Sequence, residues 1–170
     1  MKPGIAAAIG GVCIVVLSWI AYSQSSSYIS TDVEFQLIDG RRLSLAELGR
    51  RPLLITFWAT TCTVCVKKTP ELVKLYQDLH PQGAEMIAVA MSYDPPNRIL
   101  NYSKIHEIPY PISLDIDGNI ARAFDDVSLT PSTFLLDRDG RVVYKRVGEI
   151  DVANLKTQIM NLLSTNSDRT

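Results

Sequence analysis

Two cysteines separated by two residues are the side chains of this sequence whose types and spacing best suit chemistry. Cys62 and Cys65 follow an apolar run at residues 53–58 and begin a segment with helical periodicity at 63–80. Thiols three positions apart at the start of a helix come within disulfide reach, and the N–H groups of a helix N-terminus favour a thiolate. A strand, a turn and a Cys-x-x-Cys helix start therefore predict a redox-active dithiol.

Metal binding is the main competing use of two thiols. A structural zinc site needs four ligands, and the two histidines, His80 and His106, have no paired spacing. Asp115 and Asp117 alone supply too few oxygen ligands for Ca²⁺. We therefore predict no metal site and no cofactor. Cu(I) prefers thiolates and could be held by the pair, with Met91 as a further ligand, so a copper-binding module stays an alternative.

The segments around the cysteines predict a mixed α/β domain. Apolar or alternating patterns predict strands at 33–37, 53–58, 86–91, 110–114, 132–136 and 141–147. Helical spacing, caps and breakers predict helices at 63–80, 97–106, 117–124 and 151–163, and a short one after Ser44, which forms a capping box with Glu47. Strands that alternate with helices imply parallel pairing, whereas Asp-Gly turns at 39–40 and 139–140 imply hairpins.

An apolar segment at the N-terminus predicts a transmembrane helix. Residues 4–22 carry no charge over 19 positions, about the length of a helix that spans the hydrocarbon core. Trp19 and Tyr22 lie where interfacial aromatics belong, and Lys2 ahead of the run predicts a cytoplasmic N-terminus. Cleavage as a secretory signal is an open alternative. Cys13 is interpreted as an apolar membrane residue rather than a lipid attachment site.

One folded domain is predicted behind this anchor. We assign residues 1–23 to the anchor, 24–31 to a serine-rich tether, 32–164 to the domain and 165–170 to a polar tail. Lys and Arg number 17 against 18 Asp and Glu, so the net charge of −1 offers no basic face for nucleic acid. Three cysteines are too few for a scaffold held together by disulfides.

A family resemblance accompanies these features. Residues 57–65 (FWATTCTVC) resemble the signature of the thioredoxin superfamily, and Pro70 matches the proline of the helix that carries its cysteines. Thr130-Pro131 resembles the cis-proline site of the superfamily. Residues 117–151 are similar to the TlpA/ResA-like branch, which includes the CcmG/DsbE-like proteins. The resemblance extends over nearly the whole predicted domain.

The resemblance implies a thioredoxin fold, a mixed central sheet flanked by helices, with an N-terminal β-hairpin extension. It also implies a thiol-disulfide oxidoreductase that acts as a reductant. Cys62 would attack a client disulfide, and Cys65 would resolve the mixed disulfide. Pro131 would shape the client groove, the Thr130 backbone would pair with an extended client segment, and Trp58 would form a wall of the site.

The same resemblance implies a cellular setting: a single-pass protein of the bacterial inner membrane whose domain faces the periplasm. The implied partners are client protein disulfides, in cytochrome c maturation or metal-site assembly, and a membrane dithiol donor of the DsbD/CcdA type. A thioredoxin-fold peroxidase is a weaker alternative. Its Pro-x-x-x-Thr-x-x-Cys pattern would need Pro and Thr where this chain has Ile55 and Ala59, or Trp58 and Cys62.

The sequence departs from the family pattern beside the cysteines. Thioredoxins carry a buried acid where this chain has Thr56, and ResA-like proteins often carry a glutamate where it has Lys68. Either acid could accept the proton of the resolving thiol. Water or another carboxylate would have to accept the proton in place of these acids. Glu71 is the nearest carboxylate in sequence, but on a helix its direction differs from that of position 68. These departures concern the reduction potential and the choice of client rather than the fold.

Overall fold

The central feature of the structure is a five-stranded mixed sheet with the strand order β5-β4-β3-β6-β7. The computed structural model describes residue 29 and residues 32–48 and 51–165. The strands of the sheet are β3 (Leu53–Trp58), β4 (Glu85–Ala90), β5 (Ile112–Leu114), β6 (Ser132–Leu136) and β7 (Val142–Val147). β3, β4 and β5 run parallel, whereas β6 pairs antiparallel with both β3 and β7.

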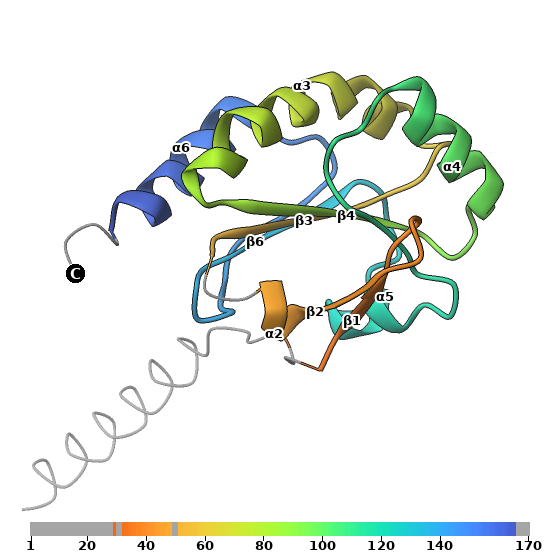
Figure 1. Cartoon of the computed structure of the whole chain (residues 1–170), viewed down its shortest axis with the longest axis horizontal. Helices are drawn as coiled ribbons and strands as arrows, with labels where there is room; N and C mark the ends of the chain where they lie inside the picture. Colours follow the sequence, from red (N-terminus) through yellow and green to blue (C-terminus); the bar gives the residue numbers. More distant parts are fainter. Residues whose placement is uncertain (1–28, 30–31, 49–50, 166–170) are drawn as a thin grey trace, which may run out of the picture.

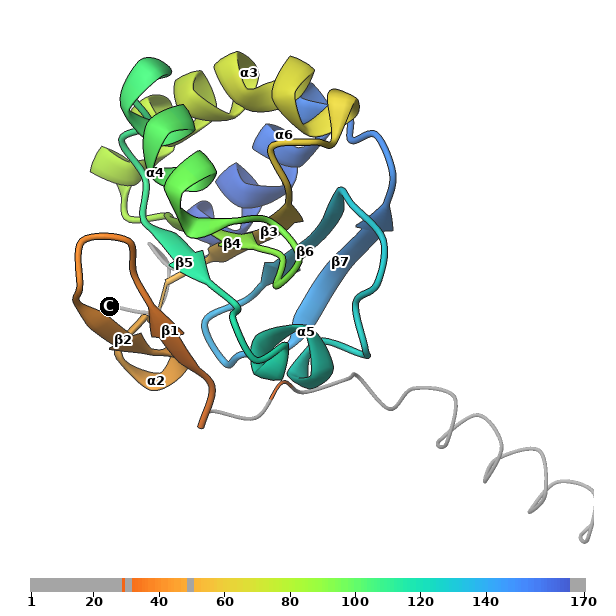
Figure 2. The same ribbon diagram turned by 90° about the vertical axis from the view of Figure 1, so that its right-hand side faces the viewer.

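The two faces of this sheet are covered by different elements. One face carries three helices, α3 (Thr63–Leu79), α4 (Pro96–Ile105) and α6 (Val152–Ser164), which lie above the sheet in Figures 1 and 2. The other face carries β1 (Glu34–Gln36), β2 (Arg42–Ser44), α2 (Leu45–Leu48) and α5 (Asn119–Ala123). A 3-10 turn, η1 (His80–Gln82), connects α3 to β4.

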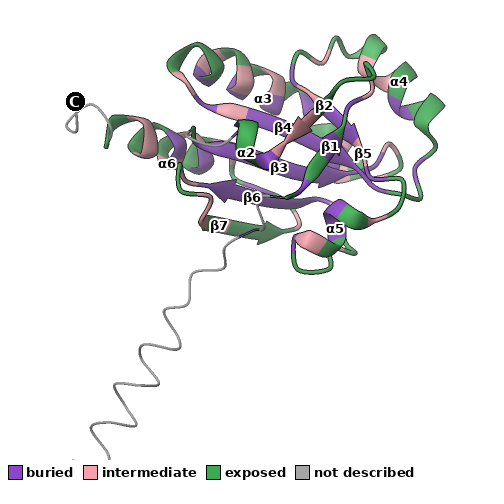
Figure 3. Ribbon diagram, turned by 60° about the horizontal axis from the view of Figure 1, so that its bottom comes forward, coloured by how far each residue is buried: buried purple, intermediate pink, exposed green. Residues whose placement is uncertain are grey.

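β3 occupies the middle of the sheet because all of its residues, LLITFW, are buried. Its side chains alternate between the faces: Ile55 and Phe57 pack in the core under the hairpin, whereas Leu54 and Trp58 pack in the core under the helices. A strand covered on both faces reads as a continuous apolar run, as here. Figure 3 shows β3, β4 and β6 buried, whereas β7 at the edge is largely exposed.

The hairpin of β1 and β2 is joined to the main sheet through β5. Leu37 forms an isolated bridge with Ser113, and the Ile38 N–H donates to the Ile112 carbonyl at 2.9 Å. The predicted capping box starts the helix that follows, since the Ser44 N–H donates to Glu47 Oε2 at 2.7 Å. The predicted mixed sheet with an N-terminal hairpin is therefore confirmed.

Three phenylalanines form the centre of the core between the sheet and α5. Phe57, Phe124 and Phe134 are fully buried and meet edge to face, with ring centroids 5.2 Å, 5.5 Å and 5.9 Å apart. Such pairs add to the free energy gained from apolar burial. β3, which precedes the cysteine-bearing helix α3, is thus anchored by a ring at the C-terminal end of α5 and a ring on β6.

Several predicted elements differ from the structure at their ends; the strand predicted at 110–114, for example, is only Ile112–Leu114. The helix predicted at 117–124 is only Asn119–Ala123, because Gly118 adopts a left-handed conformation (φ +68°) immediately before it. Pro70 lies inside α3, which continues as one helix to Leu79.

The predicted anchor at 1–23, most of the tether and all but Thr165 of the tail lie outside the described residues. Within the part of the chain that the structure describes, no helix is both long and apolar enough to cross a membrane.

Truncation of a central ring tests this core. Phe134→Ala is expected to lower the free energy of unfolding by about 3–5 kcal/mol, because it removes a buried ring and leaves a cavity between two others. Val143→Ala, on the exposed side of β7, is the matched control and should cost less than about 1 kcal/mol. Urea unfolding of the oxidised full-length chain in detergent, followed by circular dichroism, measures both. Equal losses would contradict the placement of Phe134.

Candidate active site

The two cysteines form a disulfide at the start of α3, with a Cα–Cα distance of 5.2 Å. Cys62 is the N-cap residue of the helix, and its sulfur accepts a hydrogen bond from the Cys65 N–H at 3.2 Å. The sulfur therefore lies at the positive end of the helix dipole, where a thiolate is stabilised. Cys65 is only 6% exposed, whereas Cys62 is half-buried, so Cys62 is the more accessible sulfur.

A buried carboxylate holds the loop that leads into the cysteines. Asp94 follows β4, and its two oxygens accept hydrogen bonds from the N–H of Thr60 and, at 2.8 Å, from its hydroxyl. The Cys62 N–H donates to the Ala59 carbonyl at 3.1 Å and closes the turn. Because β3 and β4 are parallel neighbours, their C-terminal ends bring these two loops together.

The Thr130–Pro131 peptide bond, immediately before β6, is cis. Pro131 is buried, and its carbonyl accepts the Gly148 N–H at 2.8 Å. Thr130 is half-buried, and its hydroxyl lies 3.3 Å from the hydroxyl of Tyr93. Tyr93 and Leu129 are 57% and 63% exposed. The segment around the cis bond therefore combines polar groups with two exposed side chains that carry apolar area.

A small cavity of about 20 Å³ lies against Cys65. This volume is sufficient for about one water molecule. Its lining comes from β3, α3, β4, the segment before β5 and the loops around β6 and β7, and consists of Thr56, Trp58, Cys65, Lys68, Thr69, Leu72, Ala88, Ile108, Tyr110, Pro131 and Ile150. The cavity thus joins Cys65, the cis-proline and both positions at which the family pattern has an acid.

Thr56 gives this cavity a neutral wall. The side chain is 4% exposed, and its hydroxyl oxygen lies 3.4 Å from that of Thr133, the residue paired with it across β3 and β6. Burial also raises the pKa of Tyr110 well above its usual range, so its phenol stays protonated at neutral pH.

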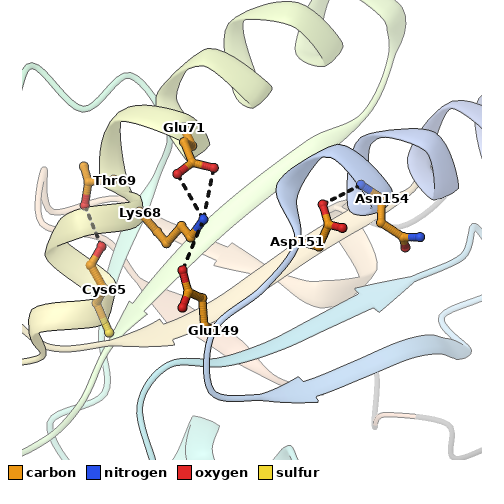
Figure 4. Close-up of polar contacts among 7 residues, drawn as sticks. All are labelled: Cys65, Lys68, Thr69, Glu71, Glu149, Asp151 and Asn154. Atoms are coloured by element: carbon orange, nitrogen blue, oxygen red, sulfur yellow. Dashed lines mark hydrogen bonds and ion pairs between the residues drawn. The ribbon is translucent and has the colours of Figure 1, made fainter.

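Lys68 joins two glutamates from different parts of the chain (Figure 4). Its ammonium lies 3.0 Å from Glu71 Oε1, on the next turn of α3, and 3.4 Å from Glu149 Oε1, between β7 and α6. The hydrogen bond to Glu71 raises the pKa of Lys68, so the amine is charged at neutral pH. Glu71 is therefore paired with Lys68 and is absent from the cavity lining, so it does not supply an acid to Cys65 directly.

Trp58, which the resemblance implies to be a wall of the site, lines the cavity beside Cys65 and is almost fully buried. The side chain is 5% exposed, and its ring packs 5.2 Å from that of Tyr102 in the helix-side core. A side chain this buried supports Cys65 and the cavity from within, rather than offering surface to a client.

A wider groove of about 560 Å³ lies on the hairpin side, and the cysteine pair is not part of it. Its lining residues include Glu34 and Arg42 of the hairpin and Asp117 and Asn119 beside α5. Within the described residues, no group of three or more His, Cys, Asp or Glu side chains is placed to hold a metal ion.

Two residues of the site were missed by the analysis of the sequence. Neither Asp94 nor Glu149 belongs to a motif in the sequence. Their partners, Thr60 and Lys68, are far away along the chain, so only the fold brings each pair together. An acid in the loop that follows a buried strand, as Asp94 is, was the one signal available.

Comparison with known proteins agrees with this geometry. The Redoxin family matches residues 25–159. The thiol-disulfide oxidoreductase ResA of Bacillus subtilis is 30% identical over 144 residues, which cover 78% of this chain and 79% of that protein. ResA of Bacillus thuringiensis is 27% identical over 126 residues, or 74% of this chain and 69% of that protein.

Solved structures give the same result for the fold. A thioredoxin candidate from Neisseria meningitidis superposes with a TM-score of 0.74 at 27% identity, covering 85% of this chain and 95% of its own. A thiol:disulfide interchange protein from Chlorobium tepidum superposes with a TM-score of 0.72 at 23% identity, covering 80% of this chain and 96% of its own, a likeness of fold alone. The chain therefore belongs to the Redoxin family, among the ResA-like thiol-disulfide oxidoreductases of the thioredoxin superfamily.

Proposed function

We propose that this protein is a membrane-anchored, extracytoplasmic reductase of client protein disulfides. The observation that carries the proposal is the position of the Cys62 sulfur, which caps α3 and accepts the Cys65 N–H. Exposure and the helix dipole both favour Cys62 as the attacking thiolate. The buried Cys65, one helical turn away, is the resolving thiol.

The exchange transfers two electrons from the cysteine pair to the client. The Cys62 thiolate attacks one client sulfur, so that a mixed disulfide forms, the client S–S bond breaks and the second client sulfur leaves and takes up a proton. Cys65 then loses its proton and attacks the Cys62 sulfur. The Cys62–Cys65 bond forms, the bond to the client breaks, and the released client thiolate is protonated.

The client groove is proposed to follow the cis-proline segment. Thr130 precedes β6 and its backbone would pair with an extended client strand, while Pro131 separates that strand from the cavity. Tyr93 and Leu129 supply exposed apolar area on either side. Surfaces of this kind, with apolar anchors around main-chain pairing, suit an extended peptide.

Anchoring by residues 1–23 would hold the domain close to membrane-bound partners. A tethered domain meets such partners at a high effective concentration without any new contact. The pair needs a source of electrons after each cycle, and a membrane dithiol donor of the DsbD/CcdA type is the partner proposed. Clients in cytochrome c maturation or metal-site assembly, which are exported and carry cysteine pairs, fit this location.

The direction of exchange is tested by the midpoint potential of the Cys62–Cys65 pair. A reductase should have a value near or below about −250 mV, because thioredoxin lies near about −270 mV. Full-length protein with Cys13→Ala is equilibrated in dithiothreitol or glutathione buffers, and its free thiols are counted by mass after maleimide labelling. A value near about −120 mV, that of a strong oxidant, would contradict the proposed direction.

The roles of the two cysteines are tested with serine variants in the Cys13→Ala background. Cys65→Ser should accumulate a mixed disulfide with a client peptide, because the resolving thiol is gone. Cys62→Ser should form at least tenfold less adduct, since the remaining sulfur is buried. Non-reducing mass spectrometry measures both adducts. More adduct on the Cys62→Ser variant would reverse the assignment.

Membrane anchoring is tested in the full-length chain by charges within the apolar segment. Val12→Arg combined with Val15→Arg should move the protein out of the carbonate-washed membrane fraction, since each arginine costs about 2.5–3.5 kcal/mol at the centre of a membrane helix. Ser26→Arg, in the tether, should leave the distribution unchanged. The mass of the parent protein identifies its N-terminus, and a mature chain that lacks residues 1–23 would overturn the anchor.

A further inference from the structure

Lys68 lies on the same face of α3 as the resolving cysteine. Residues three positions apart on a helix are surface neighbours, and both Cys65 and Lys68 line the small cavity beside the disulfide. Lys68 replaces a residue that is often an acid in the family pattern. The charge beside the resolving thiol is therefore opposite in sign to the one the resemblance implies.

No carboxylate lines this cavity among the described residues. Of the described residues that line it, Lys68 is the one with a charged side chain, while Tyr110 is neutral at ordinary pH and Thr56 contributes a hydroxyl. A thiolate formed at Cys65 would thus share the cavity with one positively charged side chain and otherwise neutral groups. Its proton must leave to water, because a charged ammonium cannot accept it.

The ammonium is held in place by Glu71 and Glu149, but these carboxylates are more exposed than the group they hold. The Lys68 side chain is 15% exposed, against 48% for Glu71 and 55% for Glu149. Water screens the half-exposed carboxylates more strongly than the enclosed lysine. Their charges therefore offset that of Lys68 only in part at the cavity.

Glu149 also connects this lysine to the cis-proline loop. It follows Gly148, whose N–H donates to the Pro131 carbonyl, and it precedes Ile150, another residue of the cavity wall. The ion pair between Lys68 and Glu149 thereby connects α3 to the segment between β7 and α6 (Figure 4), whose Ile150 lines the cavity.

We propose that Lys68 is a positioning residue for the resolving step, where its ammonium stabilises the Cys65 thiolate in place of an acid that would take the proton. The inference rests on the proposed function, since it concerns the second half of the exchange. In that step Cys65 loses its proton to water and attacks the Cys62 sulfur. The S–S bond within the pair forms as the bond from Cys62 to the client breaks.

Titration of Cys65 alone tests the proposal. Full-length protein with Cys13→Ala and Cys62→Ser has a single thiol, which avoids coupled titration. The ¹³Cβ chemical shift of this cysteine, followed against pH, gives its titration midpoint. Lys68→Met should raise the midpoint by about 0.5–1 pH unit, which leaves about three- to tenfold less thiolate at neutral pH.

A charge series separates electrostatics from packing. Lys68→Glu should raise the midpoint further than Lys68→Met, and Lys68→Arg should keep it near the parent value. Lys67→Met is the matched control, because Lys67 is an exposed lysine on the same helix and should leave the midpoint unchanged. Backbone chemical shifts verify that each variant is folded. The comparison of midpoints needs at least two folded variants of the series.

Two outcomes would overturn the proposal: equal midpoints for folded Lys68→Met and Lys67→Met proteins, or a lower midpoint for Lys68→Glu than for Lys68→Met. Neither depends on catalysis. Failure of the proposed function would instead appear as an oxidising midpoint potential of the pair, or as absence of a mixed disulfide on the Cys65→Ser variant, with the Cys65 titration unaffected.

Discussion

The hydrogen bond from the Cys65 N–H to the Cys62 sulfur is the interaction on which the site depends. It makes a reactive atom part of the architecture of α3, so the position of the sulfur follows from the position of the helix. The helix in turn is fixed by β3, whose six residues are all buried between two cores. The reactivity of the Cys62 sulfur and the packing of the core are thus coupled through the N-terminus of α3.

Beside the disulfide, the two positions at which family members carry an acid hold Thr56, which is neutral, and Lys68, which is positively charged. Thr56 pairs with Thr133, while Lys68 joins Glu71 and Glu149. The result is a cavity beside Cys65 that is lined by the neutral Thr56 and by the largely enclosed ammonium-bearing side chain of Lys68. In the proposed resolving step, a carboxylate at position 68 would accept the proton of the Cys65 thiol. The Lys68 ammonium would instead stabilise the Cys65 thiolate, and the proton would pass to solvent.

Local patterns in the sequence were sufficient for the elements and for the cysteine pair. The continuous apolar run at β3, the capping box at Ser44 and the Asp-Gly turns each carry their own physical cause. Contacts between distant segments carry no such signal. The hydrogen bonds of Asp94 to Thr60 join two loops, and the ion pair of Lys68 with Glu149 joins α3 to the segment before α6. Similarly, Trp58 reads as an aromatic wall until the fold shows that helices bury it.

The site also lies where the sheet changes direction, with β4 parallel on one side of β3 and β6 antiparallel on the other. Loops from separate strand ends meet there, and none of them belongs to the central aromatic core. Substitutions at exposed positions such as Tyr93 and Leu129 can therefore accumulate without disturbing the scaffold. Substitutions at such positions can therefore change which client proteins bind, while the Cys62–Cys65 pair at the centre of the site keeps the same reaction.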